Sequence, residues 1–128
     1  MDVTILEHSN PSMGLEEYFK YQKSEFRAFL TFEAFCSYLF DCPSKDGGVI
    51  EARSSLGEWI GGICWSGLNG LAKIFLVLVN PRFRGNGFGK TLLGEAVRTL
   101  KLSGWKTIWC VPSKKAMSFY VCNGFKLQ

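Results

Sequence analysis

The sequence lacks the features that would place it in a membrane, outside the cell or on a nucleic acid. Its longest apolar run extends only from Ile74 to Val79, whereas a membrane-spanning helix needs about 20 apolar residues. No basic segment precedes an apolar one at the start of the sequence, so we expect no signal peptide. No run of Lys and Arg exceeds two residues and the net charge is only +4, which makes nucleic-acid binding an unfavoured reading.

The cysteines form no pattern that indicates disulfides or a metal site. There are five, an odd number, and no two have C-x-x-C spacing. Each has apolar neighbours, among which a free thiol behaves as a small hydrophobic group. We therefore expect reduced thiols, a cytoplasmic location and no metal. The cysteines are Cys36, Cys42, Cys64, Cys110 and Cys122.

What the sequence does contain predicts one α/β domain over residues 1–128. The length suits a single domain, and 47% of the residues are hydrophobic, enough for a packed core. Alternating and continuous apolar runs predict the strands, and amphipathic spacing with capping residues predicts the helices. The order β-α-α-β-β-β-α-β-α-β predicts helices on both faces of a mixed sheet. The predicted strands are Val3–Leu6, Val49–Arg53, Trp59–Trp65, Leu71–Val79, Trp105–Val111 and one opening at Phe125. The predicted helices begin at Asn10–Pro11, at Thr31, after the loop Asn80–Thr91, and at the capping residue Ser113, and the third of them ends at Ser103–Gly104. Turns are expected at Ser54–Gly57 and Ser66–Gly70.

Three alternating glycines, Gly85, Gly87 and Gly89, lie between an apolar strand and an amphipathic helix. Glycine lets a ligand approach the main chain closely, and a helix N-terminus presents unpaired N–H groups with a partial positive charge. Such a turn is an anion site suited to phosphate, and positive charge is added by Arg82, Arg84 and Lys90. The plainer alternative is a loop that uses glycine only for a tight turn.

Two common phosphate-binding patterns do not fit this loop. A Walker A loop needs four residues between its first glycine and Gly-Lys-Ser/Thr, but only three separate Gly85 from Gly89-Lys90-Thr91. In the dinucleotide pattern G-x-G-x-x-G the third glycine would come one position later than Gly89. A nucleoside triphosphatase and a dinucleotide-binding fold are therefore disfavoured.

The pattern that fits is Arg/Gln-x-x-Gly-x-Gly/Ala, present as Arg84-Gly85-Asn86-Gly87-Phe88-Gly89. Downstream, Ser113-x-x-Ala116-x-x-Phe119-Tyr120-x-x-x-Gly124-Phe125 fits a second motif of the same family. With both motifs the sequence resembles the GNAT superfamily of N-acetyltransferases, closely over Leu71 to Phe125 and only in element order over the first 48 residues. The resemblance implies the acyl-CoA N-acyltransferase fold, with a single, mostly antiparallel sheet flanked by helices.

The resemblance also implies a site for acetyl-CoA. The strand ending at Val79 would splay from Trp105–Val111, and the pantetheine arm would lie in the opening beside the backbone of Leu78 and Val77. The N–H of Val79 would polarise the thioester carbonyl, and Tyr120 would protonate the leaving thiolate. Ser113 would contact the pantetheine or the thiol. The implied cofactor-binding residues are Val77, Leu78, Val79, Arg84, Gly85, Asn86, Gly87, Phe88, Gly89, Lys90, Thr91 and Ser113.

The sequence offers several candidates for the general base that takes the proton of the amine. Many relatives carry a Glu on the strand that ends at Val79, but residues 74–79 include no carboxylate. Glu51 and Glu58, on or beside the preceding strands, are the candidates, although each also suits a solvated strand-edge position. His8, the single histidine, is a weaker candidate, and an ordered water could serve instead.

These observations predict an N-acetyltransferase that moves an acetyl group from acetyl-CoA to a primary amine of a small molecule, peptide or protein. The alternatives are a CoA-binding module without catalysis and a toxin-like enzyme that acetylates aminoacyl-tRNA. Relatives usually continue past the strand that opens at Phe125, so we expect that the fold is abbreviated there, that a partner subunit supplies the further strand, or that the sequence is incomplete. An unpaired edge strand would favour a homodimer.

Overall fold

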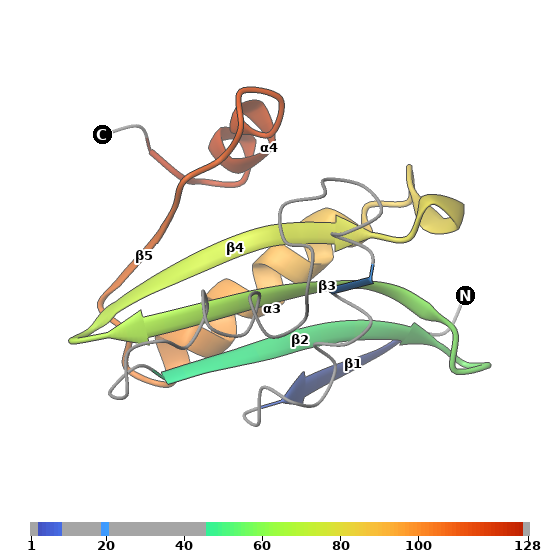
Figure 1. Cartoon of the computed structure of the whole chain (residues 1–128), viewed down its shortest axis with the longest axis horizontal. Helices are drawn as coiled ribbons and strands as arrows, with labels where there is room; N and C mark the ends of the chain where they lie inside the picture. Colours follow the sequence, from blue (N-terminus) through green and yellow to red (C-terminus); the bar gives the residue numbers. More distant parts are fainter. Residues whose placement is uncertain (1–2, 9–18, 21–45, 127–128) are drawn as a thin grey trace.

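Five strands form one sheet in the computed structural model, which describes residues 3–8, 19–20 and 46–126 (Figure 1). Their order in the sheet is β1-β2-β3-β4-β5, and all neighbours are antiparallel except β4 and β5, which are parallel. This confirms the predicted mixed, mostly antiparallel sheet. The strands are β1 Val3–His8, β2 Asp46–Ser54, β3 Trp59–Leu68, β4 Leu71–Val79 and β5 Thr107–Cys110.

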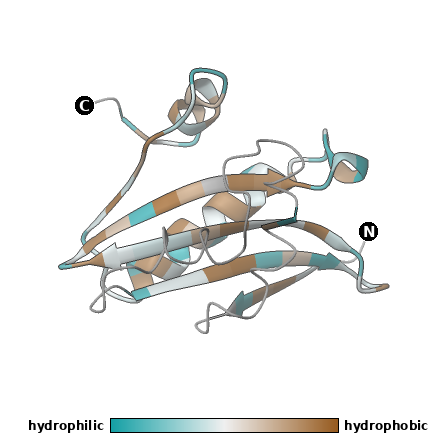
Figure 2. Ribbon diagram, viewed as in Figure 1, coloured by the Kyte–Doolittle hydropathy of each residue, from teal (hydrophilic) through white to brown (hydrophobic). Residues whose placement is uncertain are grey.

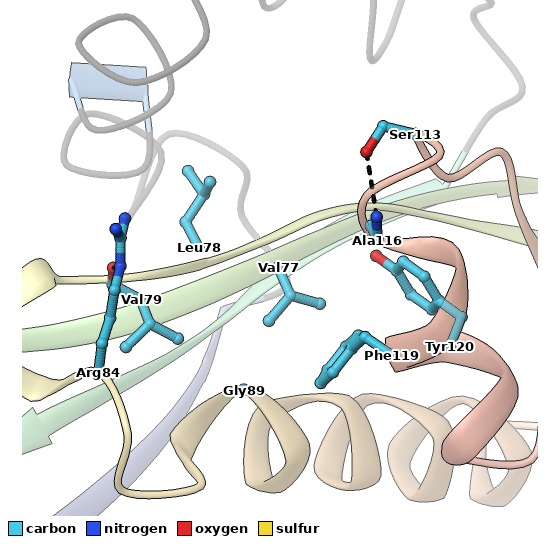
Figure 3. Close-up of a pocket in the computed structure, with 9 residues that line it drawn as sticks. All are labelled: Val77, Leu78, Val79, Arg84, Gly89, Ser113, Ala116, Phe119 and Tyr120. Atoms are coloured by element: carbon cyan, nitrogen blue, oxygen red, sulfur yellow. Dashed lines mark hydrogen bonds between the residues drawn. The ribbon is translucent and has the colours of Figure 1, made fainter.

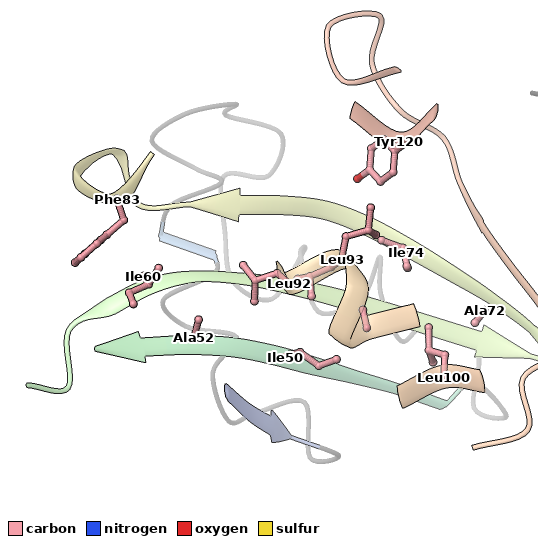
Figure 4. Close-up of a cluster of buried hydrophobic side chains, with 12 residues drawn as sticks. Ile50, Ala52, Ile60, Ala72, Ile74, Phe83, Leu92, Leu93, Leu100 and Tyr120 are labelled. Carbon is pink, nitrogen blue, oxygen red and sulfur yellow. The ribbon is translucent and has the colours of Figure 1, made fainter. Parts of the chain in front are cut away.

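Helix α3, Phe88–Leu102, covers one face of the sheet and completes the core (Figures 1 and 4). Leu92, Leu93, Ala96 and Leu100 of this helix face the sheet, where removing each of these leucines from water contributes about 1.5–3 kcal/mol. Figure 2 shows hydrophobic residues along most of β4 and polar residues in the turns that flank it. The core side chains are Ile50, Ala52, Ile60, Ile63, Ala72 and Ile74 from the sheet and Leu92, Leu93, Ala96 and Leu100 from α3.

The helix boundaries follow from glycine at both ends of α3. Gly87 adopts a positive φ of 78° as N-cap, so the helix begins at Phe88. Phe88 to Thr91, expected in the loop, therefore form the first helical turn. At the other end Gly104, with φ 91°, follows Ser103, and the N–H of Trp105 donates to the carbonyl of Leu100. The predicted glycine stop is confirmed.

A β-bulge interrupts β4 near its middle. Ile63 of β3 pairs with Val77 and Trp65 pairs with Ile74, so two steps along β3 oppose three along β4. The extra residue reverses the alternation of side chains beyond it. Val77 and Val79 consequently point toward α3, whereas Leu78 points to the other face (Figure 3).

Several predicted boundaries differ from the structure. β3 continues to Leu68, so the turn predicted at Ser66–Gly70 shortens to Asn69-Gly70, both with positive φ. The last strand is shorter than predicted and ends at Cys110. α4, Met117–Cys122, has Ala116 and not Ser113 as its N-cap. Phe125 and Lys126 are not in a strand, so the strand predicted to open at Phe125 is not formed there.

The two helices predicted before β2 lie almost wholly outside the described residues, of which Phe19 and Lys20 are helical and Phe19 is buried. Within the described ranges no helix combines the length and the apolar character that crossing a bilayer requires.

Candidate active site

A cavity of about 300 Å³ opens between the second half of β4 and helix α4 (Figure 3). β5 pairs with β4 only over Leu71–Ile74, and the chain then turns away toward α4 (Figure 1). Pro112, two residues after the end of β5, has no N–H to donate and so limits any continuation of this strand. The predicted divergence of the two strands is therefore present. The cavity is lined by Val77, Leu78, Val79, Arg84, Gly89, Ser113, Ala116, Phe119 and Tyr120.

The end of β4 offers backbone groups to this cavity. The N–H of Asn80 donates to the carbonyl of Ile60 on β3 at 2.7 Å. Because successive peptide groups of a strand point to opposite sides, the N–H of Val79 faces away from β3 and toward the cavity. The same alternation turns the backbone of Val77 toward the cavity and that of Leu78 toward β3. Val77 and Val79 are therefore better placed than Leu78 as backbone partners of a bound ligand.

The glycine turn presents a row of unpaired amides. Short helix η1, Pro81–Phe83, follows β4, and Gly85 and Gly87 take φ values of 82° and 78° that favour glycine. Among the hydrogen bonds of the described residues, none uses the backbone N–H of residues 85–90 as donor. These groups precede or begin α3, where the helix also contributes a partial positive charge. The turn therefore has the donors that a diphosphate requires.

Side chains hold this turn in place. The ring of Phe83 meets that of Phe88 edge to face, with centroids 6.2 Å apart. The Asn86 Nδ2 donates to the carbonyl oxygens of Phe83 and Arg84, at 3.1 and 3.3 Å. The hydroxyl of Thr91 donates to the carbonyl of Gly87 at 3.2 Å. The exposed side chain of Lys90 remains beside the amides, and that of Arg84 reaches back to the carbonyl of Val79 at 3.3 Å.

Tyr120 is the residue with a phenol hydroxyl among those that line the cavity. Its hydroxyl donates to the carbonyl oxygen of Phe75, at the bulge of β4, over 3.4 Å. Burial, with a smaller contribution from nearby Cys110, raises the pKa of Tyr120 to about 12. The phenol is therefore protonated at neutral pH and can act as a proton donor. Its ring packs edge to face against Phe119 and Phe125, which fixes its orientation.

Ser113 lies on the turn between β5 and α4 and lines the same cavity. Its hydroxyl oxygen accepts from the N–H of Ala116 at 3.3 Å (Figure 3). Because the turn 113–116 precedes α4, Ser113 shapes the cavity wall and does not cap the helix.

The predicted base candidates lie elsewhere. Glu51 is 3% exposed and its Oε1 accepts from the Nε of Arg53 at 3.0 Å. Glu58 forms an ion pair with Arg82 beside η1. Neither carboxylate lines the cavity. His8, at the end of β1, pairs in the sheet with Val49 on β2, so two strands, β2 and β3, separate it from β4.

A second groove, also of about 300 Å³, lies beside the end of β3, the first half of β4 and Trp109 of β5. The ammonium of Lys73 lies 5.0 Å from the ring centroid of Phe75 and 5.3 Å from that of Trp109. Lys73 and Trp109 are register partners in the two strands. Phe75 connects the two hollows, since its side chain lines this groove and its carbonyl accepts from Tyr120.

Some contributors to the site were not found from the sequence. Pro112 carries a usable signal, because a proline at the end of a predicted strand limits its pairing. Ala116 and Phe119 fall within the quoted motif but were not predicted to line the site. The bulge in β4 has no signal in the sequence, since it depends on the register with β3.

Comparisons with known proteins agree with this geometry. The family model described as the Acetyltransferase (GNAT) family matches residues 7–125. No curated protein matches the sequence. An acetyltransferase of the GNAT family from Staphylococcus aureus MU50 superposes with a TM-score of 0.75 at 21% identity, over 98% of this chain and 84% of that one.

Two aminoglycoside acetyltransferase structures have the same fold. One, meta-AAC0020 from an uncultured soil metagenomic sample, gives a TM-score of 0.76 at 16% identity, over 98% of this chain and 90% of that one. The other is AAC(6')-Iy in complex with the bisubstrate analogue CoA-S-monomethyl-acetylneamine. It gives a TM-score of 0.73 at 17% identity, over 99% of this chain and 92% of that one. At these identities the likeness establishes the fold.

Proposed function

The chain belongs to the acetyltransferase (GNAT) family, and on that premise we propose that it moves an acetyl group from acetyl-CoA to a primary amine by direct attack in a ternary complex. The observation that carries the proposal is the row of undonated amides at residues 85–90, next to the cavity between β4 and α4. A diphosphate and a thioester arm need these two features side by side. A cavity of about 300 Å³ is at the lower end of the range for small-molecule sites.

In this proposal the glycine turn and the start of α3 hold the diphosphate of acetyl-CoA. The amides of residues 85–90 donate to its oxygens, and Lys90 and Arg84 offset its charge. The backbone of Val77 and Val79 borders the pantetheine arm, and Ser113 offers a hydroxyl from the opposite wall. Phe88 and Thr91 act indirectly, by packing on Phe83 and by holding the carbonyl of Gly87.

The chemistry then needs three things from this chain. The N–H of Val79 stabilises the negative charge that develops on the thioester oxygen as the amine nitrogen bonds to the carbonyl carbon. Tyr120 donates its proton to the sulfur as the carbon–sulfur bond breaks. The proton lost by the amine passes to water, since neither Glu51 nor Glu58, the carboxylates considered as bases, is among the residues that line the cavity. Positioning both reactants supplies the rest of the rate enhancement.

The acceptor amine enters, we propose, from the groove of Lys73, Phe75 and Trp109. Phe75 lines that groove, and its carbonyl accepts from Tyr120, which lines the cavity, so the two hollows meet at this residue. A small-molecule amine and a peptide or protein amine both remain within the proposal. Because two of the similar structures are aminoglycoside acetyltransferases, amino sugars are among the small-molecule acceptors that we propose.

We also propose that two copies of the chain form a homodimer through β5. Within the described residues β5 pairs with a strand on one side, and its Trp109 side chain is 43% exposed. A second copy could add its own edge there. A monomer in sedimentation at high protein concentration would exclude this arrangement.

One observation favours the alternative of a CoA-binding module without catalysis: no carboxylate is among the residues that line the described cavity. A thermal shift with acetyl-CoA tests binding, since a ligand of the folded state raises the melting temperature. Thiol release with a panel of amines, with products identified by mass spectrometry, then tests transfer. Binding with acetylated product supports the enzyme, binding without product supports the module, and no binding excludes both.

A further inference from the structure

We propose that Asn80 is a positioning residue that couples the diphosphate turn to the thioester end of β4; this inference rests on the proposed function. Asn80 lies between Val79, whose N–H faces the cavity, and η1, which leads into the glycine turn. It is only 6% exposed, although it is polar and stands at the end of a strand.

Every hydrogen-bonding group of Asn80 is used, and the bonds extend in two directions. Toward β3, its Nδ2 donates to the carbonyl of Trp59 at 2.9 Å and its N–H donates to that of Ile60 at 2.7 Å. Toward η1, its Oδ1 accepts from the N–H of Arg82 at 3.2 Å and its carbonyl accepts from the N–H of Phe83 at 2.8 Å. One residue thereby ties a central strand to the segment that carries the phosphate-binding amides.

The side chain contributes one bond in each direction, so it acts as a brace across the strand end. Without it, the main-chain bonds to Ile60 and Phe83 remain, and β4 and η1 can still form. Their relative orientation, however, would no longer be fixed by the Trp59–Asn80–Arg82 link. The amides of residues 85–90 could still take a diphosphate, but that binding would no longer place the thioester carbonyl against the N–H of Val79.

This distinction gives a measurement that a merely structural role would not alter. Acetyl-CoA uses both the diphosphate turn and the end of β4, whereas S-acetylpantetheine uses only the latter. The ratio of their kcat/KM values reports how much the diphosphate assists the reaction. Loss of folded enzyme lowers both values equally and leaves the ratio unchanged, whereas loss of coupling lowers the ratio.

The experiment measures this ratio for the wild type, Asn80→Ala, Asn80→Asp and a core control, Ile50→Val. Asn80→Asp keeps the acceptor for Arg82 but loses the donor to Trp59. We expect the ratio to fall about tenfold in Asn80→Ala, because small misplacement of reacting groups is costly. The fall in Asn80→Asp should be smaller, and Ile50→Val should keep the wild-type ratio. A wild-type ratio in Asn80→Ala would overturn the proposal; if that variant does not fold, a wild-type ratio in Asn80→Asp would overturn it.

Failure of the proposed function would look different. It would appear as a wild-type protein that releases no thiol from either thioester with any amine. The coupling would then be measured by calorimetry, as the ratio of pantetheine to CoA dissociation constants in the same four proteins. An unchanged ratio in the Asn80 variants would again overturn the role of Asn80, and a reduced ratio would support it.

Discussion

The hydroxyl of Tyr120 lies 3.4 Å from the carbonyl oxygen of Phe75, across the gap that β5 leaves beside β4. Phe75 is at the bulge that turns Val77 and Val79 toward α3. The contact therefore ties α4 to the irregular part of β4, and it places a phenolic proton where a thioester sulfur would lie in the proposed reaction.

Replacing Tyr120 with phenylalanine removes the proton and keeps the ring. We expect kcat to fall about 10²-fold, the lower end of the contribution of a general acid, with little change in the affinity for CoA. Because the pKa is raised to about 12, the proton is lost only as pH rises toward 12. The deficit of Tyr120→Phe should therefore be constant between pH 6 and pH 9. Wild-type turnover in this variant would remove Tyr120 from the mechanism.

Gly61 leaves room for the end of β4. A Cβ at this position would lie 2.5 Å from the carbonyl oxygen of Leu78 and 3.3 Å from the Cα of Val79. Gly61→Ala should therefore displace the cavity wall, lower stability by about 1–3 kcal/mol as overpacking does, and lower kcat/KM for acetyl-CoA more than tenfold.

The matched control is Gly94→Ala on α3, where the new Cβ meets nothing within 4 Å. This change should stabilise the helix by about 0.5–1 kcal/mol and leave kinetics unaltered. Equal kinetic effects of the two alanines, with melting followed by circular dichroism, would contradict the account of Gly61.

Lys90, in the first turn of α3, should assist the diphosphate by charge. An exposed charge at a helix end contributes about 0.3–1 kcal/mol, so Lys90→Gln should weaken CoA binding about threefold, and added salt should reduce the difference. Lys101→Gln, in the last turn of the same helix, removes the same charge far from the turn and should leave CoA affinity unchanged. Calorimetry that finds equal losses for both variants would indicate a non-specific effect of net charge.

Neither of the two candidate bases, Glu51 and Glu58, should be required for the chemical step. Because neither lines the cavity, we expect Glu51→Gln and Glu58→Gln to keep kcat within about threefold, against about 10²-fold for loss of a general base. Glu51→Gln should instead lower stability by about 1–3 kcal/mol, since it removes the buried charge bonded to Arg53. A pH–rate profile that loses its acidic limb in either variant would identify that carboxylate as the base.

Local sequence patterns predicted the elements that depend on local rules. β4 was predicted with its observed bounds, because an apolar run between glycine-containing turns suits a central strand. Gly104 was predicted as the helix stop, because a left-handed residue commonly ends a helix. The glycine turn before α3 followed from glycine spacing at the start of a helix, and its binding of phosphate stays a prediction.

What the sequence could not provide depends on residues that meet through the fold. The bulge at Phe75 arises from the register between β3 and β4, so the side on which Leu78 lies could not be read from alternation. Glu51 and Arg53 lie two residues apart on β2, so their ion pair is local, whereas the burial of Glu51 depends on how the sheet packs. Asn80 precedes a proline, so its bond to the N–H of Arg82 is a local capping contact, whereas its contact with Trp59 on β3 emerges only in three dimensions.

The central claim is that the amides at the start of α3 receive a diphosphate while the end of β4 borders the attached arm. A titration of the ¹⁵N-labelled protein with CoA, followed residue by residue in amide spectra, tests it most directly. The account predicts saturable shifts at residues 85–90 and at Val77 and Val79, with none at the distant turn around Leu56. Unchanged signals at residues 85–90 in millimolar CoA would contradict it.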